Sequence, residues 1–134
     1  MNVTTMLFLS CLLLFATGCG GEKKVGGPEE TVLTCVRALE NFDVATVRSM
    51  MVSTVQNDAM LASMESAASS MGEAQRQAYQ AQFGNRTHHA AVMAEDDESA
   101  VVTVVSDAGV PGRGFTFELV YEGGKWWIES IVFQ

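Results

Sequence analysis

Residues 115–133 read FTFELVYEGGKWWIESIVF, and this segment has the pattern of a β-hairpin. Apolar and polar residues alternate over Phe115–Glu122, and a second apolar segment returns over Trp126–Phe133. Between them stand Gly123 and Gly124, which supply the positive φ angles that a two-residue hairpin turn requires. The pattern therefore predicts two antiparallel strands joined by a tight turn.

A two-residue turn also predicts which residues face each other across the hairpin. The predicted core face pairs Tyr121 with Trp126, Leu119 with Ile128, Phe117 with Ser130, and Phe115 with Val132. The opposite face pairs Val120 with Trp127, Glu118 with Glu129, and Thr116 with Ile131. Because this second face is half apolar, we expect a helix or a partner to cover part of it. The candidate interface consists of Thr116, Val120, Trp127, Ile131 and Phe133.

Two further strands are predicted upstream of the hairpin. Ala100–Ser106 is rich in β-branched residues, which favour strands, and His88–Ala94 is a weaker strand candidate. The acidic run 95–98 is interpreted as a solvated turn between them, and residues 107–114 have the Gly, Pro and Asp content of a loop. The four segments together predict an antiparallel meander.

Helices are expected before the sheet. Pro28 suits a first helical turn, and apolar residues at helical spacing predict a helix over residues 28–40. Asp43 is a typical N-cap for a second helix, with Val44, Val47, Met50 and Met51 on one side.

A long helical segment is expected over Val55–Phe83, interrupted at Gly72, because the composition is rich in Ala, Met and Gln and lacks Pro. Its apolar stripe is interpreted as core packing, and an adaptable Met-rich binding wall is the alternative. The stripe consists of Met60, Met64, Ala67, Met71, Ala74 and Ala78. The fold class is therefore α+β, with N-terminal helices packed on a four-stranded antiparallel sheet.

The N-terminal segment has the features of an export signal. The apolar run MLFLSCLLLFA at residues 6–16 is too short to span a bilayer, which takes about 20 residues. Small residues at positions 16–18 precede Cys19, and this arrangement resembles the bacterial lipobox. The resemblance implies cleavage before Cys19 and a lipid on that cysteine, which would anchor the protein in a membrane. Ordinary secretory cleavage and soluble export is the alternative.

The predicted signal, lipidation site and domain divide the chain into three parts. Residues 1–18 are the predicted signal peptide, residues 19–27 the lipidated cysteine and a Gly-rich tether, and residues 28–134 a single α+β domain. Gly20 follows the lipidated cysteine, where no Asp stands; by the same resemblance, this favours the outer membrane, facing the periplasm, in a Gram-negative host.

The charge and the cysteine content argue against nucleic-acid binding and against an intrachain disulfide. The chain has 16 acidic and 8 basic residues, a formal net charge of -8, and no clustered basic stripe, so nucleic-acid binding is disfavoured. After processing, Cys35 has no intrachain partner for a disulfide and is interpreted as a small buried hydrophobe.

The opening helix, the break at residues 41–43 and the closing GGKWWIE segment at residues 123–129 carry a second resemblance. They resemble small bacterial lipoproteins of unknown function with a nuclear-transport-factor-two-like, cystatin-like cone. The resemblance covers residues 28–134. It implies a curved sheet wrapped around helices, with a pocket at the mouth of the cone.

Few residues are candidates for chemistry. His88 and His89 are adjacent on a predicted strand and point to opposite faces, so they are not expected to share a metal ion, and no metal or cofactor is expected. Glu118 and Glu129 are predicted to face each other across the hairpin, and we interpret both carboxylates as solvent-exposed on the outer face of the sheet. The candidate pocket residues are Tyr79, His88, His89, Tyr121 and Trp126.

Three functions remain open. The first is a membrane-anchored, non-catalytic binding or interaction domain in the cell envelope, acting as a homodimer or on an envelope protein. The second is a pocket for a small apolar molecule or lipid. The third is a small isomerase or dehydratase that would use His88 or His89 with Tyr79.

Overall fold

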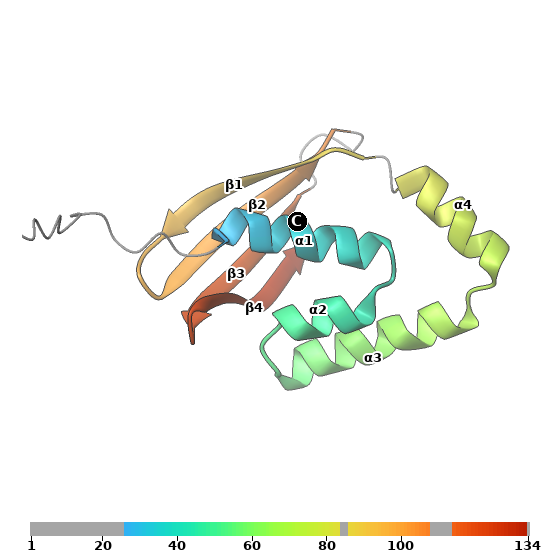
Figure 1. Cartoon of the computed structure of the whole chain (residues 1–134), viewed down its shortest axis with the longest axis horizontal. Coiled ribbons are helices and arrows are strands. Elements are labelled where there is room, and N and C mark those ends of the chain that lie inside the picture. Colours follow the sequence, from blue (N-terminus) through green and yellow to red (C-terminus); the bar gives the residue numbers. More distant parts are fainter. Residues whose placement is uncertain (1–25, 84–85, 108–113, 134) are drawn as a thin grey trace, which may run out of the picture.

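The computed structural model describes residues 26–83, 86–107 and 114–133 (Figure 1). These residues form four helices followed by a four-stranded antiparallel sheet, which confirms the predicted α+β class. The helices are α1 (Pro28–Glu40), α2 (Val44–Met50), α3 (Val55–Ser70) and α4 (Glu73–Phe83). The strands are β1 (His88–Glu95), β2 (Ser99–Ser106), β3 (Phe115–Glu122) and β4 (Lys125–Phe133), and they pair in sequence order.

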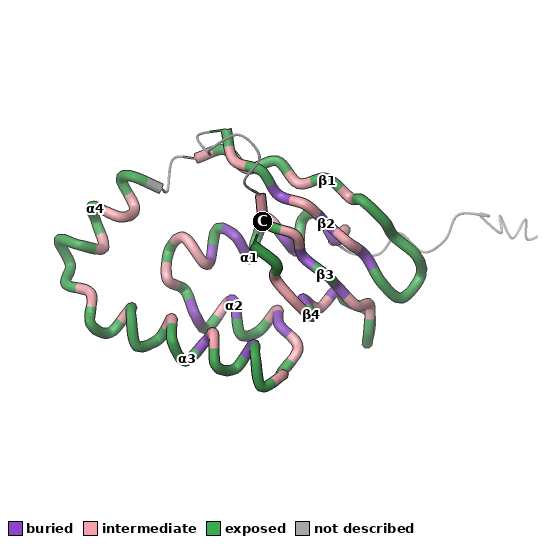
Figure 2. Tube along the Cα trace, turned by 180° about the vertical axis from the view of Figure 1, so that it is seen from behind, coloured by how far each residue is buried: buried purple, intermediate pink, exposed green. Residues whose placement is uncertain are grey.

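Helix α1 forms the hydrophobic core with one face of the sheet. It contacts β1, β2 and β4, while α2 packs beside it against β4. Figure 2 shows that the buried residues gather on α1, α2 and the central part of the sheet. The fully buried side chains include Val32 and Cys35 from α1, Val102 and Val104 from β2, Phe117 and Leu119 from β3, and Ile128 from β4.

The short connection between α1 and α2 follows from local chemistry. Asp43 caps α2 by accepting hydrogen bonds from the Thr46 hydroxyl at 2.6 Å and the Thr46 amide at 3.1 Å, and these bonds lower the pKa of Asp43. Phe42 has a φ of 54°, a left-handed conformation that is unfavourable for a bulky residue. Its ring packs edge-on against Tyr79 of α4 at 4.8 Å, a contact that helps to offset this cost.

The predicted break at Gly72 is confirmed, because α3 ends at Ser70 and α4 begins at Glu73. The interpretation of the Met and Ala stripe as core packing is correct for Met60 and Met64 and wrong for the three alanines. Met60 and Met64 are half-buried against the core, whereas Ala67, Ala74 and Ala78 are exposed. The reason is that α3 and α4 extend away from the sheet and then turn back toward β1, as Figure 1 shows. Only Asn57 and Leu61 of α3 are buried.

The predicted hairpin register is correct near the turn and wrong beyond Leu119. Tyr121 pairs with Trp126, Val120 with Trp127, and Leu119 with Ile128, as predicted. Beyond that point Glu118 faces Ser130, Phe117 faces Ile131, Thr116 faces Val132, and Phe115 faces Phe133. One extra residue in β4, Glu129, forms a β-bulge, and each later residue of β4 moves to the opposite face.

Because of the bulge, two of the sequence-based predictions are wrong. Ile131 and Phe133 lie on the helix-facing side of the sheet, whereas the candidate interface placed them on the outer side. The predicted pair of Glu118 and Glu129 does not form, because Ser130 stands opposite Glu118 and donates a 2.6 Å hydrogen bond to its carboxylate.

The bulge is held by the segment that leads from α2 into α3. The Val52 amide donates to the Ile128 carbonyl at 2.8 Å, and Met51 forms a parallel bridge with Ile128. The buried Asn57 side chain donates to the carbonyl of Glu129 at 2.9 Å and to the carbonyl of Val52 at 2.8 Å. One amide group thus satisfies the bulged carbonyl and fixes the start of α3 against β4.

We expect Asn57→Ala to destabilise the domain by about 2 kcal/mol, because two carbonyl oxygens at a buried position lose their donor. Chemical denaturation of residues 20–134 measures this change. Gln56→Ala, at the exposed neighbouring position, is the control and should change the stability by less than about 0.5 kcal/mol. Equal stability of the two variants would show that Asn57 does not hold the bulge.

Candidate functional site

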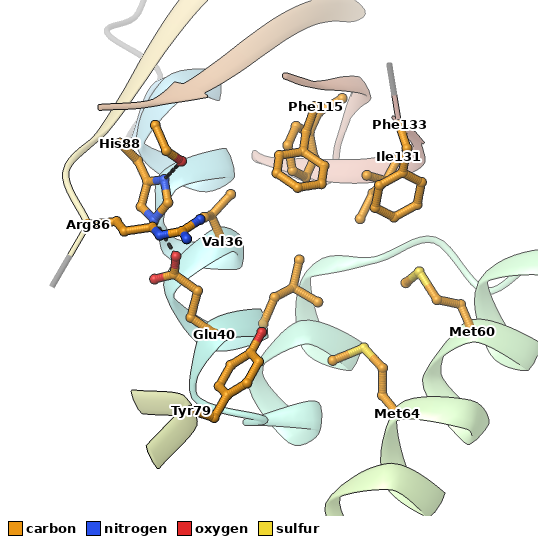
Figure 3. Close-up of a pocket in the computed structure, with 13 residues that line it drawn as sticks. Val36, Glu40, Met60, Met64, Tyr79, Arg86, His88, Phe115, Ile131 and Phe133 are labelled. Atoms are coloured by element: carbon orange, nitrogen blue, oxygen red, sulfur yellow. Dashed lines mark hydrogen bonds and ion pairs between the residues drawn. The ribbon is translucent and has the colours of Figure 1, made fainter. Parts of the chain in front are cut away.

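A cavity of about 380 Å³ lies between the sheet and the helices α1, α3 and α4. Figure 3 shows that its two ends differ in chemistry. Apolar side chains from α3, β3 and β4 form one end, and polar side chains from α1, α4, β1 and β2 gather at the other. This separation is typical of a site for a small molecule with an apolar body and a polar group.

The apolar end depends on the bulge in β4. Ile131 and Phe133 line this end because the extra residue turns them toward the helices, and Phe133 packs edge-on against Phe115 with ring centroids 5.4 Å apart. Opposite them, Met60 and Met64 of α3 reach into the cavity (Figure 3). Methionine side chains are unbranched and adapt readily, so this wall can fit ligands of different shapes.

The polar end contains a chain of three hydrogen-bonded side chains. His88 of β1 lies between Glu40 and Ser106, with its Nε2 2.5 Å from Glu40 Oε1 and its Nδ1 2.7 Å from Ser106 Oγ. The side chains of His88 and Glu40 are only 8% and 15% exposed. Hydrogen bonds with so little water around them are stronger than those at a protein surface.

Two further polar side chains border this chain. Figure 3 shows Arg86 beside His88 and Glu40, and it shows the hydroxyl of Tyr79 directed toward the space between Glu40 and Met64. The cavity therefore offers a guanidinium, a phenol, an imidazole, a carboxylate and a hydroxyl at one end.

Of the five candidate pocket residues, Tyr79 and His88 line the cavity. The other three do not line it. His89 points away from the cavity, and its Nε2 lies 2.8 Å from Asp107 Oδ1 at an exposed position. Trp126 is 3% exposed within the core, and Tyr121 packs against it with ring centroids 5.1 Å apart.

The sequence analysis did not identify Glu40, Arg86 or Ser106 as site residues. Ser106 stands directly opposite His88 in the β1–β2 pair, but only because of a bulge between Val92 and Ala94. If the register of Glu95 and Ala100 continued without the bulge, His88 would face Asp107. The pairing of His88 with Ser106 could therefore not be read from the spacing alone.

The rest of the candidate interface lies on the outer face of the sheet. Thr116, Val120 and Trp127 are half-buried there, and Val132 occupies the outer position that had been predicted for Ile131. Trp127 already has partners within the chain. Its Nε1 donates to the Glu122 carbonyl at 3.2 Å, and Lys125 Nζ lies 3.7 Å from the centre of its ring.

The described ranges hold neither a cluster of metal ligands nor a helix that could span a membrane. Among these residues, no group of three or more His, Cys, Asp or Glu side chains is placed to hold a metal ion. Within the same ranges, no helix has the length and apolar character needed to cross a membrane. No protein-family model matches the chain, and no curated protein matches it. The cavity and the N-terminal sequence are therefore the features of this chain that bear on its function.

Cys35 is confirmed as a small buried hydrophobe in the core and lies apart from the cavity lining. Burial raises the pKa of its thiol to about 12, so only about one molecule in ten thousand carries a thiolate at pH 8.

We expect Cys35, the single thiol of residues 20–134, to resist iodoacetamide at pH 8 in the folded protein and to react fully after denaturation. Intact-mass analysis after a timed exposure measures both states, and free cysteine in the same tube is the control. Rapid alkylation of the folded protein would mean that α1 is not packed against the sheet.

Proposed function

We propose that the protein is a lipid-anchored protein of the cell envelope whose α+β domain binds a small, mainly apolar molecule in the cavity. The observation that carries the proposal is the cavity itself, with its apolar and polar ends. Ligand pockets typically enclose roughly 300–1,000 Å³, and a volume of about 380 Å³ suits a compact ligand.

The side chains that line the cavity indicate the chemical class of the ligand. An apolar body would contact Met60, Met64, Phe115 and Ile131, and burial of that body would supply most of the binding free energy. A polar group on the same molecule would face Arg86 and the other polar side chains at the opposite end. The ligand is therefore proposed to be a small amphipathic molecule.

The cavity favours ligand binding more strongly than the outer face of the sheet favours an interaction with another protein. Trp127, the largest residue of the candidate interface, is occupied by Lys125 and by the Glu122 carbonyl. Ile131 and Phe133 line the cavity and do not extend the outer face. We also propose the cystatin-like cone for the fold, because the cavity lies between the sheet and the helices that pack on it.

The proposed location at a membrane is argued from the N-terminal sequence. Cys19 follows three small residues at the end of an apolar run of signal-peptide length, and residues 20–27 have the composition of a flexible tether. Lipid on Cys19 would hold the domain at a membrane surface, facing the periplasm from the outer membrane in a Gram-negative host.

We expect Met64→Trp to weaken the binding of an apolar fluorophore such as 1-aminoanthracene by about tenfold or more, because the larger ring fills the cavity. Fluorescence titration of residues 20–134 measures the dissociation constant. Ser66→Trp, at an exposed position of the same helix, is the matched control and should bind like the parent protein. Failure of the parent protein to bind apolar fluorophores and ligands of this size would refute the proposed pocket.

We expect Cys19→Ser to abolish the incorporation of labelled palmitate and to move the protein out of the membrane fraction, because the acceptor thiol is lost. Metabolic labelling and cell fractionation measure both effects. Cys11→Ser, within the predicted signal peptide, is the control and should leave both unchanged. A Cys19→Ser protein that keeps its palmitate label would place the lipid elsewhere.

A further inference from the structure

We propose that Ser106 is a nucleophile and that the cavity hydrolyses a small acyl ester. The inference rests on the proposed function, because the ester is the molecule that the cavity would bind. The observation behind it is the hydrogen-bonded chain from Ser106 through His88 to Glu40, which lies in the wall of an apolar cavity.

The chain has the arrangement that activates a serine hydroxyl. A nucleophile needs a base within hydrogen-bond distance, and that base needs a third group to orient it. Ser106 Oγ lies 2.7 Å from His88 Nδ1, and Glu40 Oε1 lies 2.5 Å from His88 Nε2. All three side chains border the same cavity.

The partners determine how the protons are arranged. An ionised carboxylate can only accept a hydrogen bond, so Nε2 of a neutral His88 carries the ring proton and donates it to Glu40. Nδ1 is then left with a lone pair and accepts from the Ser106 hydroxyl. In this tautomer the imidazole is ready to take the proton of Ser106.

The same geometry argues against His88 as a base acting directly on the ligand. Both ring nitrogens are engaged by side chains of the protein, and the side chain is only 8% exposed. Of the three hydrogen-bonded side chains, Ser106 carries the hydroxyl oxygen. Its hydrogen bond to the imidazole makes that oxygen more nucleophilic. Acyl transfer to Ser106 is therefore the reaction that this arrangement favours.

The reaction proceeds in two balanced steps. In the first, Ser106 Oγ attacks the carbonyl carbon of the ester, its proton passes to His88 Nδ1, the carbon–oxygen bond to the alcohol breaks, and the alcohol leaves with that proton. In the second, water attacks the acyl-serine, gives a proton to Nδ1, and releases the carboxylic acid as Ser106 recovers its proton. Glu40 stabilises the imidazolium formed in each step, and Arg86 is the cationic side chain at this end of the cavity.

The apolar end of the cavity selects the substrate. An acyl chain placed between the methionines of α3 and the side chains of Phe115 and Ile131 would bring its carbonyl carbon toward the polar end. A volume of about 380 Å³ limits this chain to short or medium length. The substrate class is therefore a small ester of a short or medium-chain fatty acid.

An alkyl fluorophosphonate, which reacts with activated serines, tests the proposal on the full chain in membranes of the cells that express it. Ser106 lies in the tryptic peptide of residues 87–113, and tandem mass spectrometry identifies the modified residue. We expect labelling at Ser106 and loss of that label in Ser106→Ala. Ser99→Ala is the matched control, because Ser99 lies in the same peptide and strand, is exposed, and bonds to Asp96.

Two variants of the supporting residues test the mechanism. His88→Asn removes the base and should slow the labelling of Ser106 by about 100-fold or more, and Glu40→Gln should slow it by about tenfold or more. The hydrolysis of p-nitrophenyl butyrate by the same membranes, corrected for membranes without the protein, should fall in parallel. Labelling that is unchanged in His88→Asn would overturn the proposal.

Ser106→Cys provides a measurement that does not depend on the loss of a hydrogen bond. The imidazole should draw the proton from this thiol, so iodoacetamide at pH 7 should alkylate Cys at position 106 at least about tenfold faster than free cysteine. Equal or slower alkylation would overturn the proposal, as would the absence of fluorophosphonate label on Ser106 in a protein that binds the apolar fluorophore. A protein that binds neither reagent would refute the pocket and, with it, the esterase.

Discussion

The buried amide of Asn57 connects the parts of the fold that form the cavity. It donates to the carbonyl of the bulged residue Glu129 and to the carbonyl of Val52, so it joins α3, the α2–α3 connection and the edge strand β4. A bulge leaves a backbone group without its ladder partner, and burial of such a group is unfavourable unless another donor satisfies it. Asn57 satisfies it, and Ile131 and Phe133 consequently face the helices.

Most of the secondary structure could be predicted because it follows from local chemistry. The Gly pair at residues 123–124, the N-cap Asp43 and the β-branched segment over Ala100–Ser106 each determine their own neighbourhood, and the structure agrees with all three. The bulges could not be predicted in the same way. Nothing in the residues around Glu129 or Met93 marks them as extra, because each bulge depends on contacts or register at the level of the sheet.

The candidate site was only partly predictable for the same reason. Tyr79 is an aromatic residue with a polar tip and His88 is a histidine on a predicted strand, so both could be named from the sequence, and both line the cavity. Glu40 ends a helix and Ser106 ends a strand, positions at which polar residues are ordinary. They become part of a site only because the packing of α1 on the sheet and the register of β1 bring them to opposite sides of one imidazole.

The helical arm formed by α3 and α4 is largely exposed and forms one wall of the cavity. Two residues of α3 are buried, and the contacts of α4 include the ring of Tyr79 on Phe42, the side chain of Gln80 near Asn41 and a hydrogen bond from Arg76 to the Ala68 carbonyl of α3. A wall with so few buried contacts opens at a lower free-energy cost than the sheet does. Under the proposed function, a ligand would enter the cavity by way of this wall without disturbing the core between α1 and the strands.

The bulge in β1 has a consequence for how neighbouring molecules meet. In the described part of the chain β1 pairs with β2 alone, so its other side is a sheet edge that could accept a strand from a second molecule. The irregularity at Met93 breaks the spacing of backbone groups along that edge, and charged Glu95 stands at its end. If the proposed lipid anchor crowds molecules on a membrane surface, this edge would hinder them from joining edge to edge into aggregates.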